Sequence, residues 1–213
     1  MSYRFTADQI AAGRRLFGGP SRFVMGAAGL EHLPPASAVE IAVAGRSNAG
    51  KSSLINALTG VNGLARASNT PGRTRELNFF DVNGRLALVD MPGYGFAKAP
   101  KSEVKAWQAV LRGYLRGRPG LTRAFVLIDA RHGILKADED MLDLLDEAAV
   151  TYQIVLTKAD KIAPAELAKV TAKVAAAMKK HPAAFPEIHA TSSVTGAGIP
   201  ELRAEIAGLV ETL

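Results

Sequence analysis

The sequence predicts an α/β protein in three layers, with a six-stranded, mostly parallel sheet between two layers of helices. From Val39 onward, short apolar runs alternate with longer segments of helical periodicity, as expected of strand–helix–strand units. A glycine-rich loop that begins at Gly45 joins the first apolar run to the first helical segment. The pair Asn83-Gly84 between two of the runs indicates a tight hairpin, which makes one edge strand antiparallel.

The chain divides into an N-terminal extension, residues 1–38, and one domain, residues 39–213. In the extension, the capping-box pattern from Thr6 to Gln9 predicts a short helix that ends near Leu16, before Gly18-Gly19-Pro20. Strands are predicted in the domain at 39–44, 76–82, 85–90, 123–129, 151–156 and about 185–190. Helices are predicted at 51–59, 102–116, 137–149, 164–180 and 199–211.

The composition excludes several classes of protein. Of the 213 residues, 48% are hydrophobic and 22% are charged, which is typical of a folded globular chain. The chain has no cysteine, which excludes disulfides, zinc-thiolate sites, iron–sulfur clusters and a cysteine nucleophile. No apolar run approaches 18 residues, and Arg4 and Asp8 interrupt any signal-peptide core. We therefore expect a cytoplasmic protein that does not enter a membrane.

The positive charge is concentrated in one third of the chain. The net charge is +6, and residues 66–123 carry eleven Lys and Arg against four acidic residues, a local charge of +7. A clustered positive field attracts a polyanion such as RNA. The alternative is an ordinary solvated face, and the composition does not decide between the two.

The loop from Gly45 to Ser52 carries the strongest motif. It reads Gly45-Arg46-Ser47-Asn48-Ala49-Gly50-Lys51-Ser52 and leads to Ser53 at the start of a helix, the strand–loop–helix context of a phosphate-binding loop. Backbone N–H groups in such a loop cradle the β-phosphate. Lys51 would reach the β- and γ-phosphates, and the Ser52 hydroxyl would bind Mg²⁺.

Two further segments are predicted to complete the phosphate and metal site. Asp90 ends an apolar strand and would hold the metal through water, and in the following Met91-Pro92-Gly93 the N–H of Gly93 would contact the γ-phosphate. In Pro71-Gly72-Arg73-Thr74, the turn favours Thr74 as a second hydroxyl ligand, with Thr70 as the competing candidate. The predicted metal ligands are thus Ser52, Thr74 and Asp90.

The last two segments predict a preference for guanine. In Thr157-Lys158-Ala159-Asp160, the carboxylate of Asp160 could accept hydrogen bonds from N1–H and the 2-amino group of guanine. Adenine offers neither donor and would leave that carboxylate unpaired. Lys158 would lie across the plane of the base. Backbone N–H groups of Thr191-Ser192-Ser193 could donate to guanine O6.

These segments fall in the order of the five motifs of translation-factor-type GTPases. Four strings narrow the resemblance to the EngB (YihA/YsxC) family, within the TrmE-Era-EngA-EngB-Septin-like P-loop GTPases: Gly45–Asn56, Thr70–Thr74, Leu77–Phe80 and Asp90–Gly95. The resemblance covers about residues 21 to 205, with one departure at Arg75, where Gln is more usual.

The resemblance implies a Ras-like P-loop fold and a GTP-binding domain in residues 39–213. It implies slow, Mg²⁺-dependent GTP hydrolysis, with Lys51, Thr74 and Gly93 as the catalytic residues. It further implies association with the large ribosomal subunit during its maturation and a requirement for normal cell division and septation. We expect the protein to act as a monomer.

Two positions bear on hydrolysis. Tyr94 follows Gly93 where Ras-like enzymes carry the Gln that orients the attacking water, so hydrolysis should be slow without an external factor. Asn48 resembles a residue that holds K⁺ in related GTPases, and we expect K⁺ to stimulate hydrolysis. The alternative is that Asn48 only shapes the loop.

The helix at 102–116 combines an apolar face with a basic one. Val104, Trp107, Leu111 and Tyr114 fall on one face and are expected in the core. A neighbouring basic arc, flanked by the loops that should respond to nucleotide, would read RNA phosphates; its members and the flanking cations are Lys101, Lys105, Arg112, Arg116, Arg66, Arg73, Arg75 and Lys98. The rival functions are a division-apparatus module that binds protein partners and a P-loop kinase or ATPase.

Overall fold

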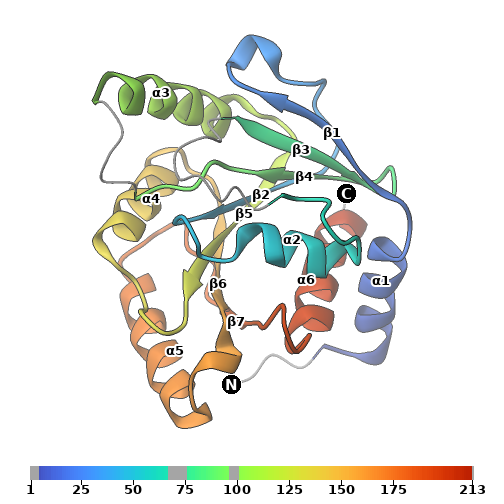
Figure 1. Ribbon diagram of the computed structural model, residues 1–213, viewed down its shortest axis with the longest axis vertical. Helices are drawn as coiled ribbons and strands as arrows, with labels where there is room; N and C mark the ends of the chain where they lie inside the picture. The colour runs from blue at the N-terminus through green and yellow to red at the C-terminus, as the bar shows by residue number, and fades with distance from the viewer. Residues whose placement is uncertain (1–4, 67–75, 96–100, 213) are drawn as a thin grey trace.

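The computed structural model describes residues 5–66, 76–95 and 101–212, with only the backbone described for 101–106. Its centre is a seven-stranded sheet in the order β1-β3-β4-β2-β5-β6-β7 (Figure 1). The strands are β1 (Ser21–Ala27), β2 (Glu40–Gly45), β3 (Leu77–Val82), β4 (Leu86–Asp90), β5 (Leu121–Asp129), β6 (Tyr152–Thr157) and β7 (His189–Ala190). Neighbouring strands are parallel except where β3 meets β1 and β4.

The prediction of six strands with an antiparallel strand at the edge was wrong in both respects. The additional strand is β1, which covers the outer side of β3, so the antiparallel strand β3 lies one place inside the edge. The pattern of β1 is hard to detect because a bulge between Phe23 and Met25 interrupts the alternation of its side chains. Ala27 is the buried residue of this strand, whereas Phe23 and Val24 are exposed.

The helices are close to their predicted positions. They are α1 (Ala7–Phe17), α2 (Lys51–Thr59), α3 (Lys101–Gly117), α4 (Lys136–Glu147), α5 (Pro164–Met178) and α6 (Ile199–Glu211), with short 3₁₀ turns η1 (Leu30–His32) and η2 (Ala159–Lys161). The capping box at Thr6 is present, since its hydroxyl accepts from the N–H of Gln9 and its own N–H donates to the Gln9 side chain. None of the helices in the described part of the chain is long and apolar enough to cross a membrane.

Two apolar cores confirm the three-layer architecture. On one face of the sheet, Ala42 and Ala44 of β2 belong to the core that includes Leu111 and Tyr114 of α3, and α4 and α5 complete it. On the other face, Ile41 of β2 belongs to the core built with α1, α2 and α6. Adjacent β2 residues enter opposite cores because side chains alternate along a strand. The expected core role of Trp107 is confirmed, since it packs against the first core.

One arginine joins the N-terminal segment to the sheet. Arg118, just after α3, donates to both carboxylate oxygens of Glu40 on β2 and to the carbonyl oxygens of Pro34 and Pro35. Both side chains of the Arg118–Glu40 pair are buried. This buried pair fixes the segment between β1 and β2. The start of the chain is held separately, because α1 lies against α6 (Figure 1).

Candidate nucleotide-binding site

The phosphate-binding loop connects β2 to α2 as predicted. Asn48 and Gly50 both have left-handed backbone conformations, with φ of 63° and 95°, and these fold the loop back over the start of the helix. Gly50 precedes Lys51 without a side-chain cap, so no side chain competes for the N–H groups of the first turn. These N–H groups and the positive end of the nine-residue helix are suited to bind phosphate oxygens.

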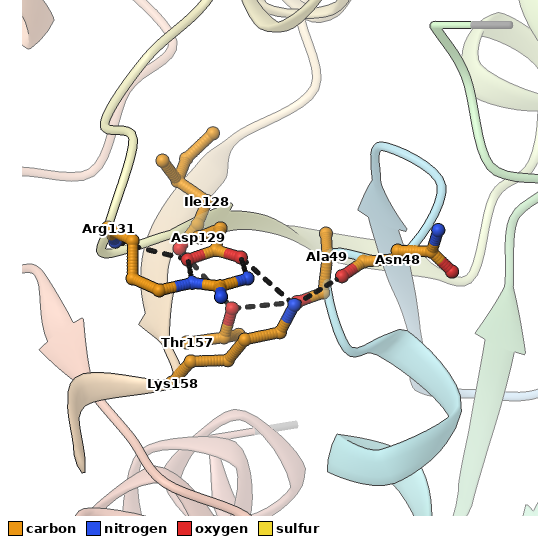
Figure 2. Close-up of polar contacts among 7 residues, drawn as sticks. All are labelled: Asn48, Ala49, Ile128, Asp129, Arg131, Thr157 and Lys158. Atoms are coloured by element: carbon orange, nitrogen blue, oxygen red, sulfur yellow. Dashed lines mark hydrogen bonds and ion pairs between the residues drawn. The ribbon is translucent and has the colours of Figure 1, made fainter. Parts of the chain in front are cut away.

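The segment after β6 is hydrogen-bonded to this loop (Figure 2). Thr157 donates its hydroxyl to the Ala49 carbonyl oxygen at 2.7 Å. Lys158 has a left-handed conformation (φ 56°), and its ammonium lies 2.6 Å from the Asn48 carbonyl oxygen. The two segments predicted to bind guanine and phosphate are therefore joined directly.

Asp129, at the end of β5, holds Lys158 in this position. Its carboxylate lies 2.9 Å from the Lys158 ammonium and also accepts two hydrogen bonds from the Arg131 guanidinium (Figure 2). Burial acts to raise the pKa of Asp129, but hydrogen bonds from Arg131 and Lys158 hold that pKa below its usual range. Neither Asp129 nor Arg131 was predicted from the sequence as a site residue. The available signal was an acidic residue at the end of a buried strand.

The two segments expected to recognise guanine lie side by side. The N–H of Ala159 donates to the carbonyl oxygen of Thr191 at 3.1 Å. A hydrogen bond with the Ser192 side chain, followed by contacts with Lys161, lowers the pKa of Asp160. The Ser192 hydroxyl oxygen in turn accepts from the N–H groups of Val194 and Thr195. The carboxylate of Asp160 is thus ionised and oriented from the Thr191–Ser193 side.

The predicted Mg²⁺ site contains a buried carboxylate oxygen that has no hydrogen-bond partner among the described residues. Asp90 Oδ1 is buried and makes no hydrogen bond to any residue that the structure describes. Burial raises the pKa of Asp90 to about 6, an effect that the charge of Lys51 partly offsets. The Ser52 hydroxyl makes a long contact, 3.4 Å, with the Arg66 carbonyl oxygen. An orphan carboxylate oxygen and a hydroxyl are hard donors that suit Mg²⁺.

Gly93 lies directly against the phosphate-binding loop. A β-carbon at this position would come within 3.2 Å of the Ser47 nitrogen and 3.3 Å of the Lys51 ammonium nitrogen. Only a glycine therefore fits there without displacing the loop. Upstream, Met91 is fixed to β2 by a hydrogen bond from its N–H to the Val43 carbonyl oxygen, and Pro92 links it to Gly93.

The Tyr94 side chain is buried and hydrogen-bonded to Asp138, a residue that was not predicted from the sequence to belong to the site. Its hydroxyl donates to Asp138 Oδ1 at 3.0 Å, and Tyr94 is only 8% exposed. Burial, the charge of Asp138 and their hydrogen bond raise the pKa of Tyr94 well above its usual value, so the phenol stays protonated. Arg46 donates to Asp138 Oδ2 at 3.1 Å. Asp138 thus connects the phosphate-binding loop with the segment after Gly93.

Some predicted residues lie outside the described part of the chain. These are Gly72, Arg73 and Thr74, together with Thr70, Arg75 and Lys98, and the side chains of Lys101 and Lys105. The metal and catalytic roles given to Thr74 remain predictions.

The charge of residues 66–123 is partly compensated by acidic residues from elsewhere in the chain. Arg112 pairs with Glu147 at 2.6 Å on the surface. Arg118 pairs with Glu40, and Arg123 with Glu205, both in buried positions. The excess of +7 counted along the sequence therefore overstates the positive charge of this region in space. Arg66 and Arg116 remain exposed.

Comparison with known proteins identifies the family. Residues 40–158, more than half of the chain, match a family model described as "50S ribosome-binding GTPase". The "Probable GTP-binding protein EngB" of Ruegeria pomeroyi is 60% identical over 205 residues, covering 96% of this chain and 93% of that protein. The chain belongs to the EngB family of GTP-binding proteins. The protein of the same name from Rhodopseudomonas palustris is 55% identical over 96% of this chain and 95% of its own length.

Solved structures agree with the fold. A "probable GTP-binding protein engB" has a TM-score of 0.65 at 24% identity and covers 82% of this chain and 100% of that one. Era in complex with MgGDPNP and a fragment of 16S ribosomal RNA has a TM-score of 0.62 at 25% identity over 81% of this chain and 56% of that one. EngB family membership confirms the resemblance seen in the sequence and favours a GTPase over a P-loop kinase or ATPase.

Proposed function

We propose that this EngB family protein is a Mg²⁺-dependent GTPase that assists assembly of the large ribosomal subunit in a nucleotide-gated manner. The observation that carries the proposal is the direct bonding of the guanine segment to the phosphate-binding loop through Thr157 and Lys158. The description of the matching family model as ribosome-binding supports the choice of partner. A linked requirement for cell division and septation belongs to the same proposal.

Different residues of the site would bind the phosphates, the guanine base and Mg²⁺. The N–H groups from Gly45 to Ser53 and the Lys51 ammonium would hold the phosphates. Asp160 would pair with the guanine edge, and the N–H groups of Thr191–Ser193 would donate to its O6. Ser52, Asp90 and Thr74 would hold Mg²⁺, which neutralises charge between the β- and γ-phosphates when bound.

Hydrolysis is expected to be slow. The Tyr94 hydroxyl is committed to Asp138, so we do not expect this side chain to orient an attacking water. Lys51 and the N–H of Gly93, with Thr74, would stabilise the γ-phosphate, while water activation would need an external contribution such as the ribosomal particle or K⁺ near Asn48. Equal hydrolysis rates in KCl and NaCl would contradict the K⁺ proposal.

Co-sedimentation with large ribosomal subunits tests the central proposal. We expect binding with a GTP analogue, weaker binding with GDP or no nucleotide, and weaker binding at higher salt. Replacing Arg116 by Ala should weaken binding, whereas the matched change at Lys179, an exposed cation just after α5 (Pro164–Met178), should not. Absence of co-sedimentation in every nucleotide state would contradict it.

A protein partner in the division apparatus is the second candidate. The observation that favours it is the exposure of Phe23 and Val24 on β1, at the edge of the sheet. In that case the Arg116 variant would retain its partner, and Phe23→Ser would lose it. In either case we place the protein in the cytoplasm as a monomer.

A further inference from the structure

Asp138 is a fully buried carboxylate whose hydrogen bonds extend well beyond its own helix. It lies in the first turn of α4 and is 0% exposed. Oδ1 accepts from the Tyr94 hydroxyl, and Oδ2 accepts from Arg46 Nε and from the N–H of Leu135. A buried carboxylate is costly unless its oxygens are satisfied, so these partners fix its position.

Tyr94 is attached to the phosphate-binding loop at its backbone as well. Its carbonyl oxygen accepts from the N–H of Ser47 at 3.1 Å, and its N–H donates to the carbonyl oxygen of Gly45 at 3.4 Å. The hydroxyl adds a third attachment, through Asp138, to the same loop. Because Tyr94 directly follows Gly93, these attachments also restrict the backbone of Gly93.

Of GTP and GDP, only GTP has a phosphate group that would contact Gly93. The predicted partner of its N–H is the γ-phosphate, which GDP lacks. A clamp that fixes Gly93 beside Lys51 reduces the conformational entropy that binding of the γ-phosphate would otherwise have to remove. Such a clamp therefore changes the affinity for GTP more than the affinity for GDP.

We propose that Asp138 is a positioning residue which clamps Tyr94 against the phosphate-binding loop and thereby favours GTP over GDP. The inference rests on GTP binding at this site and adds the residue pair that sets the preference between the two nucleotides. The hydrogen bond from Arg46 holds Asp138 against the phosphate-binding loop. Asp138 in turn holds Tyr94, which restricts the backbone of the adjacent Gly93. Asp138 lies in the first turn of α4 and accepts from the N–H of Leu135 just before it, so the start of this helix is coupled to the clamp.

The decisive variant is Tyr94→Phe, which removes one hydroxyl and leaves the Arg46–Asp138 pair in place. Affinities for fluorescent GDP and for a fluorescent non-hydrolysable GTP analogue are measured by titration of the full chain. We expect the affinity for the GTP analogue to fall by about tenfold, as is usual for loss of a hydrogen bond to a charged group, and the affinity for GDP to change by less than about twofold. Asp138→Asn should shift the ratio in the same direction, with an additional loss for GDP because Arg46 is released.

A matched control separates positioning from a general effect of removing a buried hydroxyl. Tyr152→Phe also removes a buried hydroxyl, one without a hydrogen-bond partner among the described residues, and should leave both affinities unchanged. Equal losses of both nucleotides in Tyr94→Phe, or an unchanged ratio, would overturn the clamp. Failure of the unaltered protein to bind either nucleotide would instead contradict the proposed function. If Asp138→Asn does not fold, Tyr94→Phe alone decides.

Discussion

The ammonium of Lys158 lies 2.6 Å from the carbonyl oxygen of Asn48, and so the guanine segment is bonded directly to the phosphate-binding loop. The bond crosses from the end of β6 to the loop after β2, two strands that are separated in the sheet by β5. Asp129 of β5 supplies the third point of contact, at 2.9 Å from the same ammonium. Both halves of the site are therefore preorganised.

Replacing Lys158 by Met should weaken the binding of GDP and of the GTP analogue to a similar extent. The change keeps an apolar stem for the base but removes the bond to the loop and leaves Asp129 with one fewer partner. We expect a loss of about 1.5–3 kcal/mol in binding free energy for both nucleotides, measured by fluorescence titration. Lys169→Met, on the exposed side of α5, is the control and should have no effect. A loss confined to one nucleotide would show that the loop does not depend on this bond.

Asp160→Asn should change which base is bound. The carboxylate that would accept from N1–H and the 2-amino group of guanine becomes an amide that can donate to the 2-oxo group of xanthine. We expect weaker binding of GTP and stronger binding of xanthosine triphosphate, by at least about tenfold in their ratio, since unpaired buried polar groups cost about 1–3 kcal/mol. Competition titrations with the two triphosphates measure it. An unchanged ratio would exclude Asp160 from base recognition.

The affinity for Mg²⁺ should depend on pH around the pKa of Asp90. Burial raises this pKa to about 6, above the usual 3.8, and Mg²⁺ binds the ionised carboxylate. The ionised fraction falls from about nine-tenths at pH 7 to about one-tenth at pH 5, so the Mg²⁺-dependent part of nucleotide affinity should fall by about tenfold. Titrations with and without EDTA at each pH isolate this part. Asp90→Asn should remove the pH dependence; a variant that retained it would locate the titrating group elsewhere.

Two arginines that are close together in the sequence should differ in their effect on stability. Arg118→Ala leaves the buried carboxylate of Glu40 without its partner, which should cost about 3–5 kcal/mol in the free energy of unfolding. Arg112→Ala removes an exposed pair with Glu147 and should cost no more than about 1 kcal/mol. Urea denaturation of both variants compares them directly. Similar losses would mean that burial of the Arg118 pair is not what stabilises this part of the fold.

Most of the helices and strands, and the residues of the nucleotide-binding motifs, could be predicted from local sequence patterns. The features that were not predicted depend mainly on contacts between residues far apart in the sequence. The phosphate-binding loop and the segment Thr157–Asp160 were readable because spacing and residue type determine their chemistry. β1 was missed because its bulge interrupts the alternation of side chains and only one of its residues, Ala27, is buried. Asp138 stands in the acidic run Asp138-Glu139-Asp140 and matches no motif, and only the packing of α4 against the segment after β4 shows its role. The charge of residues 66–123 was overestimated because Glu40, Glu147 and Glu205 are distant in sequence.

The placement of α1 has a consequence for the order in which the chain can fold during synthesis. α1 packs against α6, which is synthesised only after all seven strands of the sheet. Likewise, β1 has to wait for β3 before it can pair, and the segment between β1 and β2 has to wait for Arg118. α1 and β1 therefore acquire these native contacts only after later elements have been made, and a nascent chain that lacks α6 leaves the apolar face of α1 uncovered.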